Sequence, residues 1–420
     1  STPMTMDALQ QRLGRGGAGG PGGPGGVGAA VARGGNRGAT PGAGGGATTI
    51  ALGFAGSNNL KIKEELRRDR IEMVHAAVDL TLRRPLLVRT LLPTDAESQA
   101  RFIEEAQITG QLQHPNIQAV IELGINPDGK PWMVMSRTLG KPLAELVDEV
   151  HTEEDDSDLA VERRERELLD VFLKICDAIA YAHSRGIIHR DLKPDVIDVG
   201  DFGDVIVGGW REAKPVQMAG VAEDAAVMSD RRAMGEPLTM EGTLIGTLPW
   251  MPPEQAAGRV SQLDQTADVY NLGAILYFML TGTPPYIGDR DDEVLADIME
   301  GLLEPPSQRA PHVVIRPELE SIVIKAMASR PAMRYREVRE LREAIEDYLA
   351  GRALDTARVG VVDLLKRWAS SNLPVVIAVL VGLLALILLP VMLVSSGKDA
   401  QIKQLQDDIR KLQTPAGEHE

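Results

Sequence analysis

The stretch that decides the fold is residues 187–194, which read Ile-Ile-His-Arg-Asp-Leu-Lys-Pro. It follows an apolar run with helical spacing over 168–182, so a long helix is expected to lead into a short buried strand. The polar residues His189, Arg190 and Asp191 then follow, with Lys193 close behind. A carboxylate such as Asp191 can accept a proton from a hydroxyl group, so this stretch is the first candidate for a catalytic site.

The residues on either side of this stretch predict two lobes of different kinds. One helix is expected over 96–112, and after residue 138 the apolar spacing is mostly helical. A strand-rich half followed by a helix-rich half predicts an α+β fold, with a small lobe at 59–137 and a larger lobe at 138–352. The strands expected in the small lobe are 60–66, 73–80, 86–92, 117–123 and 131–137.

Three segments outside the lobes have distinct compositions. Residues 1–58 are rich in glycine and poor in large apolar side chains, so they are expected to form a disordered tether. Residues 373–394 carry no charge over a length that suits a transmembrane helix, and 353–372 would link this helix to the larger lobe. In the tail 395–420, apolar residues recur at coiled-coil-like spacing over 400–412, which predicts a short seam that could self-associate.

Residues 189–194 resemble the catalytic loop of protein kinases, in which the pattern His-Arg-Asp-Leu precedes further site residues. The resemblance implies a two-lobed kinase-like fold: a small lobe with an antiparallel sheet and one helix, helix C, and a larger helical lobe. It also implies that Asp191 occupies the position of the catalytic base and that His189, Arg190 and Lys193 surround it. The nearest relatives are expected among bacterial serine/threonine kinases that are tethered by a C-terminal membrane span.

Further matches to the kinase family lie on both sides of this loop. Residues 101–106 resemble helix C, which gives Glu105 the role of the ion-pairing glutamate. The sequence around Glu254 resembles the end of an activation segment, and the family's late arginine is matched by Arg334. Asp268 lies at the start of the buried helix that follows. The resemblance therefore assigns Glu254, Asp268 and Arg334 to the support of the fold.

The residues that would hold ATP in a kinase are replaced in this chain. Counting back from the third strand places the phosphate-covering loop between the first two strands, and its three glycine positions fall on Arg67, Asp69 and Glu72. Long side chains obstruct the close approach of the backbone to phosphates, and the acidic ones repel them. The lysine position of the third strand falls on Arg89, which keeps the charge and is expected to pair with Glu105.

Both magnesium ligands are replaced as well. The positions of the family's metal-binding asparagine and aspartate, counted from the catalytic aspartate, fall on Val196 and Gly209. Neither offers a ligand atom to a hard cation, so no metal is expected, although Asp195 and Asp198 lie near enough to be displaced ligands. Residues 201–203 read Asp-Phe-Gly, but they come too early for the metal motif and lie between two short apolar strands, as a hairpin turn does.

These replacements favour a pseudokinase, which is a kinase fold kept for binding other proteins, with no nucleotide or metal cofactor. The expected partners are proteins, such as an active kinase or its substrates, and a membrane reached through one span. Two alternatives remain open. One is a weak or unconventional serine/threonine kinase that uses ATP and Mg²⁺, and the other is a structural membrane protein that self-associates.

Composition limits the compartment and the partners. The chain has 60 acidic and 45 basic side chains, for a formal charge of −15, which argues against nucleic acid as the main partner. The one cysteine, Cys176, lies in an apolar helical run and is expected to be buried and unreactive. No export signal is recognised, and with the family resemblance this predicts a single-pass membrane protein whose kinase-like domain is cytoplasmic.

Overall fold

A computed structural model describes residues 59–352 except 94, 154–156, 217, 219–225 and 231–245, and also residues 403, 405 and 406. The chain divides into two units, residues 1–354 and 355–420, and both lobes belong to the first unit. The predicted tether, linker and membrane span lie outside the described residues, as does all of the predicted tail seam except the three positions named. Within the part that is described, no helix combines the length and the apolar character that a bilayer crossing requires.

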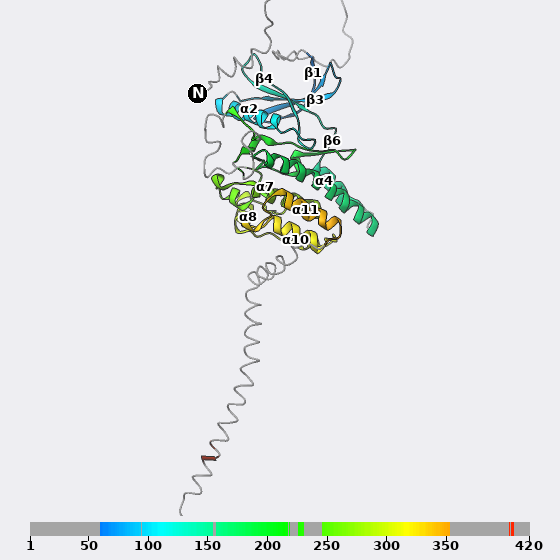
Figure 1. Ribbon diagram of the computed structural model, residues 1–420, viewed down its shortest axis with the longest axis vertical. Coiled ribbons are helices and arrows are strands. Elements are labelled where there is room, and N and C mark those ends of the chain that lie inside the picture. Colours follow the sequence, from blue (N-terminus) through cyan, green and yellow to red (C-terminus); the bar gives the residue numbers. More distant parts are fainter. Residues whose placement is uncertain are drawn as a thin grey trace, which may run out of the picture. The chain divides into compact units, whose positions relative to one another are not determined.

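The small lobe is an antiparallel sheet with one helix beside it, as predicted (Figure 1). Its strands are β1 (Leu60–Arg68), β2 (Glu72–Asp79), β3 (Pro85–Leu91), β4 (Val120–Ile125) and β5 (Pro131–Ser136), in the order β1-β2-β3-β5-β4. The fourth strand begins at Val120 and not at residue 117. Ile117 instead forms a bridge with Val207 of the large lobe, and the amide of Gln118 donates to the Val207 carbonyl at 3.1 Å.

The helix of the small lobe, α2 (Ala96–Gln111), forms where the sequence predicts helix C. Asp95 caps its first turn, because its carboxylate accepts from the Ser98 amide at 2.8 Å. Phe102 and Ala106 face the sheet and pack with Met133 and Met135 of β5. The helix ends before Pro115, which cannot continue it.

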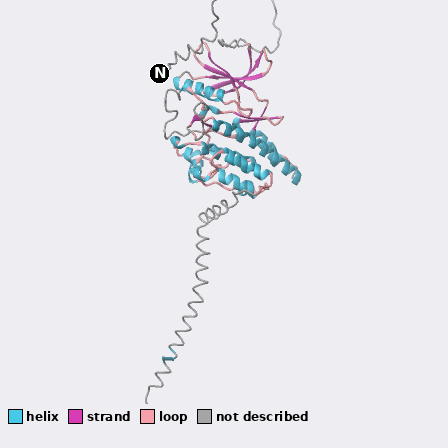
Figure 2. Cartoon of the chain, viewed as in Figure 1, coloured by secondary structure: helices cyan, strands magenta, loops and turns pink. Residues whose placement is uncertain are grey.

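The large lobe is mainly helical, with short strands near its junction with the small lobe (Figure 2). Its helices are α3 (Leu143–Thr152), α4 (Asp158–Ser184), α6 (Pro253–Ala256), α7 (Gln265–Thr281), α8 (Asp291–Glu300), α9 (Pro306–Arg309), α10 (Pro317–Ala326) and α11 (Val338–Leu349). Its strands are β6 (Gly140–Pro142), β7 (Ile187–Ile188), β8 (Ile197–Gly200), β9 (Val205–Val207) and β10 (Lys214–Pro215). Two of its 3₁₀ turns carry candidate site residues or their neighbours, η2 (Pro194–Val196) and η3 (Trp210–Glu212).

The core of the large lobe is built around α4 and α7. Every residue of α7 from Ala267 to Thr281 is buried, so this helix runs through the interior and is enclosed on all sides. Asp264 caps its start and Gly282, with a φ of 70°, ends it. Cys176 of α4 is fully buried and burial raises the pKa of its thiol, as expected of an unreactive cysteine.

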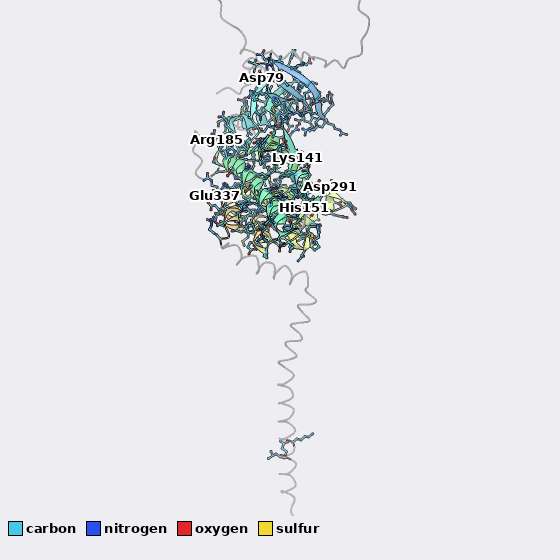
Figure 3. All side chains as sticks on the ribbon, turned by 90° about the vertical axis from the view of Figure 1, so that its right-hand side faces the viewer. Asp79, Lys141, His151, Arg185, Asp291 and Glu337 are labelled. Carbon is cyan, nitrogen blue, oxygen red and sulfur yellow. The ribbon has the colours of Figure 1, made fainter. Side chains whose placement is uncertain are left out.

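A short segment joins the two lobes along one side of the molecule. Figure 3 places Lys141 of β6 between Asp79 of the small lobe and His151 of the large lobe. β6 pairs with β8, and β8 pairs with β9, so the junction continues directly into the strands that carry the candidate site.

Candidate active site

The turn between β1 and β2 lies where the phosphate-covering loop was predicted, and it is closed by its own side chains. The Asp69 carboxylate accepts from the amides of Ile71, at 2.7 Å, and Glu72, at 2.8 Å. These backbone hydrogen bonds, chiefly the one from Glu72, lower the pKa of Asp69. Two amides that a glycine-rich loop would offer to phosphate oxygens are therefore already bound to a carboxylate of the protein.

Glu72, at the third glycine position, turns inward and binds Arg89. Its carboxylate accepts from Nε and Nη2 of Arg89 at 2.9 and 2.5 Å, and it also pairs with Arg67. The predicted pair with helix C is confirmed, because Nη1 and Nη2 of Arg89 donate to Glu105 at 2.5 and 3.2 Å. Glu72 and Glu105 are each only 3% exposed. One guanidinium is thus held between two buried carboxylates.

The electrostatics of this cluster favour the charged guanidinium. Burial by itself lowers the pKa of Arg89, but the carboxylates of Glu105 and Glu72 outweigh burial and raise the pKa above its ordinary value. The sequence identified Glu72 as a residue that would repel phosphate, but not as a ligand of Arg89. A signal was present, since Glu72 and the inward-facing Val74 lie on the same face of β2.

Hydrogen bonds to the Asp268 carboxylate hold the backbone of the loop 189–194. The buried carboxylate of Asp268 accepts from the amides of His189 and Arg190 at 2.8 and 2.9 Å, and it contacts Nε2 of His183 at 2.7 Å. Burial raises the pKa of Asp268, but the hydrogen bond and charge of His183 and the backbone amides outweigh it and lower the pKa. Arg190 adopts a left-handed φ of 68°, so the loop is strained and depends on these bonds.

Asp191 is held by two neighbours rather than one. Lys193 Nζ donates to one carboxylate oxygen at 3.1 Å, and the Thr247 hydroxyl donates to the other at 3.0 Å. Lys193 also donates to the Thr247 hydroxyl at 2.6 Å, so the three side chains form a closed ring. The kinase resemblance placed Lys193 in the loop beside Asp191, but the contact of Asp191 with Thr247 was not predicted.

The two magnesium positions meet each other with no room for a ligand. Gly209 has a left-handed φ of 73°, and a Cβ placed on it would lie 2.6 Å from a methyl carbon of Val196. The Gly208 amide donates to the Val196 carbonyl at 2.8 Å, which fixes the two segments against each other. An aspartate at 209 would collide with Val196, so the residues present do not fit a magnesium ion.

Residues 201–203 form the tip of a hairpin, as predicted. β8 and β9 flank them, the Gly203 amide donates to the Gly200 carbonyl at 3.0 Å, and the Phe202 side chain is 96% exposed. Of the two aspartates considered as displaced ligands, Asp195 is exposed, and burial raises the pKa of Asp198, which disfavours the charge that a metal ligand carries. Within the described part of the chain, no three His, Cys, Asp or Glu side chains gather as a metal site.

The remaining predicted support residues come together. Arg334 donates to both oxygens of Glu254, at 2.6 and 2.7 Å, and its side chain is fully buried beneath the ring of Tyr270.

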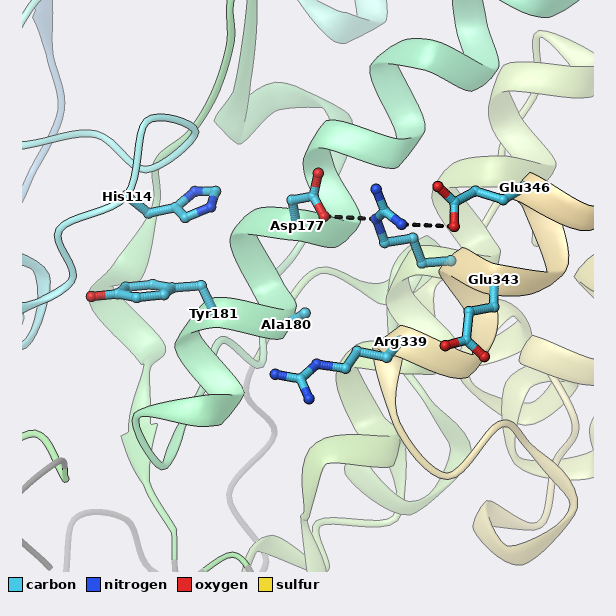
Figure 4. A pocket seen from close by; sticks show the side chains of 8 residues that line it. His114, Asp177, Ala180, Tyr181, Arg339, Glu343 and Glu346 are labelled. Atoms are coloured by element: carbon cyan, nitrogen blue, oxygen red, sulfur yellow. Dashed lines mark hydrogen bonds and ion pairs between the residues drawn. The ribbon is translucent and has the colours of Figure 1, made fainter. Parts of the chain in front are cut away.

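A polar pocket of about 360 Å³ lies elsewhere, between α4 and α11, where Arg342 bridges Asp177 and Glu346 (Figure 4). This pocket shares no residue with the loop 189–194, with Arg89 and its two carboxylates, or with the contact between Val196 and Gly209.

The sequence of the chain was compared with known families and proteins. The family described as "Protein kinase domain" matches residues 84–344. The chain belongs to the protein kinase family. This membership confirms the resemblance stated for residues 189–194 and accounts for the two-lobed fold.

Kinases from several bacteria are similar to it over the lobes. The serine/threonine-protein kinase PknB of Mycolicibacterium smegmatis is 34% identical over 309 residues, which are 72% of this chain and 45% of PknB. The serine/threonine-protein kinase PknD of Chlamydia trachomatis is 34% identical over 271 residues, 63% of this chain and 28% of PknD. PknD of Protochlamydia amoebophila is 31% identical over 268 residues, 63% of this chain and 27% of PknD. The chain therefore matches less than half the length of each of these kinases.

Proposed function

We propose that this member of the kinase family is a pseudokinase, which binds proteins and does not transfer phosphate. The observation that carries the proposal is the position of Glu72, whose buried carboxylate occupies Arg89 together with Glu105. In a kinase the corresponding lysine pairs with one glutamate, that of helix C, and with the phosphates. Here both sides of the guanidinium are bound to carboxylates of the protein, so a phosphate would have to displace Glu72 to reach it.

Two further features of the site disfavour phosphate and metal binding. The amides of residues 71 and 72 are bound to Asp69, so the turn offers fewer donors to a phosphate. A side chain at position 209 would collide with Val196. Phosphoryl transfer depends on positioning and on neutralising the charge of the phosphates, and Mg²⁺ supplies much of that charge. With no cofactor held, Asp191 would have no donor to act upon.

The proposal includes partners and a location that follow from the sequence. The buried Glu254–Arg334 pair and Asp268 preserve the fold of the large lobe, and a kept fold without a working site suits binding to an active kinase or to its substrates. The uncharged residues 373–394 support a single membrane span, and the family resemblance supports a kinase domain on the cytoplasmic side. The apolar spacing of residues 400–412 supports self-association through the tail.

A second function, that of a weak serine/threonine kinase, is favoured by one observation. The ring of Asp191, Lys193 and Thr247 keeps a carboxylate oriented with a cation beside it, an arrangement able to accept a hydroxyl proton. Such a kinase would need ATP and Mg²⁺ held by residues other than those at the family positions. A structural role, in which the span and tail drive assembly, is the third candidate, and deletion of residues 395–420 followed by measurement of oligomer size tests it.

A phosphoryl-transfer assay separates the first two functions. The full-length protein in detergent is incubated with γ-labelled ATP and Mg²⁺ or Mn²⁺, alone and with a generic serine/threonine substrate protein, beside the variant Asp191→Asn. The proposal predicts that label incorporation by the wild-type protein equals that of the variant. Incorporation that requires Asp191 would establish the weak kinase.

A further inference from the structure

The turn between β8 and β9 carries an exposed aromatic side chain at its tip. The Phe202 side chain is 96% exposed, although the turn does not need it. The Gly203 amide donates to the Gly200 carbonyl, and Gly203 adopts the positive φ of 77° that closes the turn. Lys174 of α4 donates to the Gly203 carbonyl at 2.6 Å, which ties the tip to the large lobe. Phe202 is therefore held out into solvent by a fixed turn.

A second exposed apolar side chain lies beside this tip. β6 pairs with β8 in a register that sets Gly140 opposite Gly200. One step further out, Leu139 comes opposite residue 201, and its carbonyl oxygen lies 3.4 Å from where a Cβ on Gly200 would be. The Leu139 side chain is 68% exposed. The two apolar residues and the two exposed aspartates that flank them are here called the hairpin face: Leu139, Asp201, Phe202 and Asp204.

The hairpin face has the chemistry of a surface that binds a segment of protein. Apolar anchors with a polar rim are typical of such surfaces, and the acidic rim favours a segment with positive charge beside its apolar side chains. Because only two apolar side chains form the centre, the affinity for a separate molecule would be low. A segment tethered to the same chain does not need a high affinity.

One segment of the predicted tether has the matching chemistry. Residues 4–13 read Met-Thr-Met-Asp-Ala-Leu-Gln-Gln-Arg-Leu, whereas residues 14–46 contain no Leu, Ile, Met or Phe. Three apolar residues of the first range recur at spacings of three and four, which suits one face of a helix: Met6, Leu9 and Leu13. Residues 1–58 carry four arginines and one acidic residue, in a chain whose formal charge is −15. The segment is therefore apolar with a basic surrounding, as the hairpin face requires.

The length of the predicted tether allows this contact. A glycine-rich chain of about 45 residues, the length of residues 14–58, spans about 35–40 Å on average. A domain of about 290 residues has a radius of gyration of about 19 Å, so its surface is within reach. At an effective concentration of about 1 mM, a contact with a Kd of about 0.1 mM is about nine-tenths formed.

We propose that residues 4–13 bind the hairpin face of their own chain. The apolar side chains of the segment cover Leu139 and Phe202, and Arg12 lies beside the two aspartates. A protein partner that uses the same face has to displace the segment first. The contact does not depend on whether the candidate site binds a nucleotide.

Hydrogen exchange of the full-length protein tests this contact, with mass spectrometry resolving residues 1–13. The test variant is Leu139→Ser with Phe202→Ser, which removes both apolar side chains from an exposed surface. Leu159→Ser with Val314→Ser is the matched control, because these side chains are 81% and 78% exposed elsewhere on the large lobe. Peptides from the buried helix α7 report whether the large lobe remains folded.

In the wild-type protein, the amides of residues 4–13 should exchange about tenfold more slowly than in a synthetic peptide of residues 1–15. Leu139→Ser with Phe202→Ser should abolish this protection, whereas the control variant should keep it. Asp201→Lys with Asp204→Lys should lower the protection severalfold, because the charge of the rim is reversed. This second variant provides the comparison if the first one loosens α7.

Three results would overturn the proposal. One is exchange of residues 4–13 in the wild type at the rate of the synthetic peptide, and another is protection that persists in the Leu139→Ser, Phe202→Ser variant. The third is protection that disappears on dilution, because it would show a contact between copies. ATP binding to the wild type would refute the proposed function and leave these exchange results as they are.

Discussion

The contact between Gly209 and Val196 allows the filled metal position to be tested by stability alone. Replacement of Gly209 by alanine adds the Cβ that any ligand-bearing residue would also carry. That atom would lie 2.6 and 2.8 Å from carbons of Val196. The left-handed φ of 73° costs a residue with a Cβ about 1–2 kcal/mol. The collision with Val196 adds about 1–3 kcal/mol, because the well-packed neighbour must shift.

A matched control isolates the collision from the backbone cost. Gly129 has nearly the same φ, 78°, and a Cβ added to it would meet no atom within 4 Å. Gly129→Ala should therefore lose only the backbone term of about 1–2 kcal/mol. The free energy of unfolding, measured in urea, should be about 1–3 kcal/mol lower for Gly209→Ala than for Gly129→Ala.

A second substitution shows whether Val196 is the cause. Val196→Ala removes the methyl carbon nearest to the new Cβ, although the Val196 Cβ at 2.8 Å remains, so relief is partial. The combined loss of Gly209→Ala and Val196→Ala should be smaller than the sum of the single losses by about 1 kcal/mol. The claim that Val196 fills the metal position would be refuted if Gly209→Ala and Gly129→Ala lowered the free energy of unfolding equally. It would also be refuted if the effects of Gly209→Ala and Val196→Ala were strictly additive.

Three further outcomes follow from the described contacts. Glu72→Gln should lower the free energy of unfolding by about 1–3 kcal/mol in a urea titration, because a buried charged hydrogen bond is lost. The control Glu64→Gln, at an exposed residue, should change the free energy of unfolding little. Equal effects of the two variants would contradict the role given to Glu72. Arg334→Ala should cost about 3–5 kcal/mol by the same measurement, because it leaves the buried carboxylate of Glu254 without its partner, and a loss below about 1 kcal/mol would count against it. Burial lowers the pKa of His114 below the ordinary value of 6.5, so the unfolded chain binds more protons than the folded one on acidification. The free energy of unfolding should therefore fall as the pH drops below about 6.5. His114→Asn should flatten that slope between about pH 5 and 7, and an unchanged slope would be the opposing result.

Pairs with one strong partner could be predicted from the sequence. The Arg89–Glu105 pair and the Glu254–Arg334 pair follow from the kinase resemblance, and the flanking strands predict that the early Asp-Phe-Gly is a hairpin tip. In each case the residue type and its spacing left one candidate partner.

Contacts that depend on the direction of a side chain in three dimensions could not be predicted. Glu72 was expected to lie beside the phosphates, but its carboxylate binds Arg89 of the neighbouring strand β3. The closeness of Val196 to Gly209 depends on the angle between two loops, which no local pattern records. Residues 228–230 lie in a stretch without apolar periodicity, so their hydrogen bonds to Gln107 and other residues of α2 had no signal in the sequence.

The central claim, that this kinase fold holds no nucleotide, is tested most directly by thermal unfolding of the full-length protein with and without millimolar ATP and Mg²⁺. A ligand that binds only the folded state stabilises it by about 2.7 kcal/mol at one hundred times its dissociation constant. A pseudokinase that binds no nucleotide should have the same unfolding midpoint in buffer, in ATP alone and in ATP with Mg²⁺. A rise in the midpoint that requires the metal would show that the site accepts a nucleotide and would contradict the account.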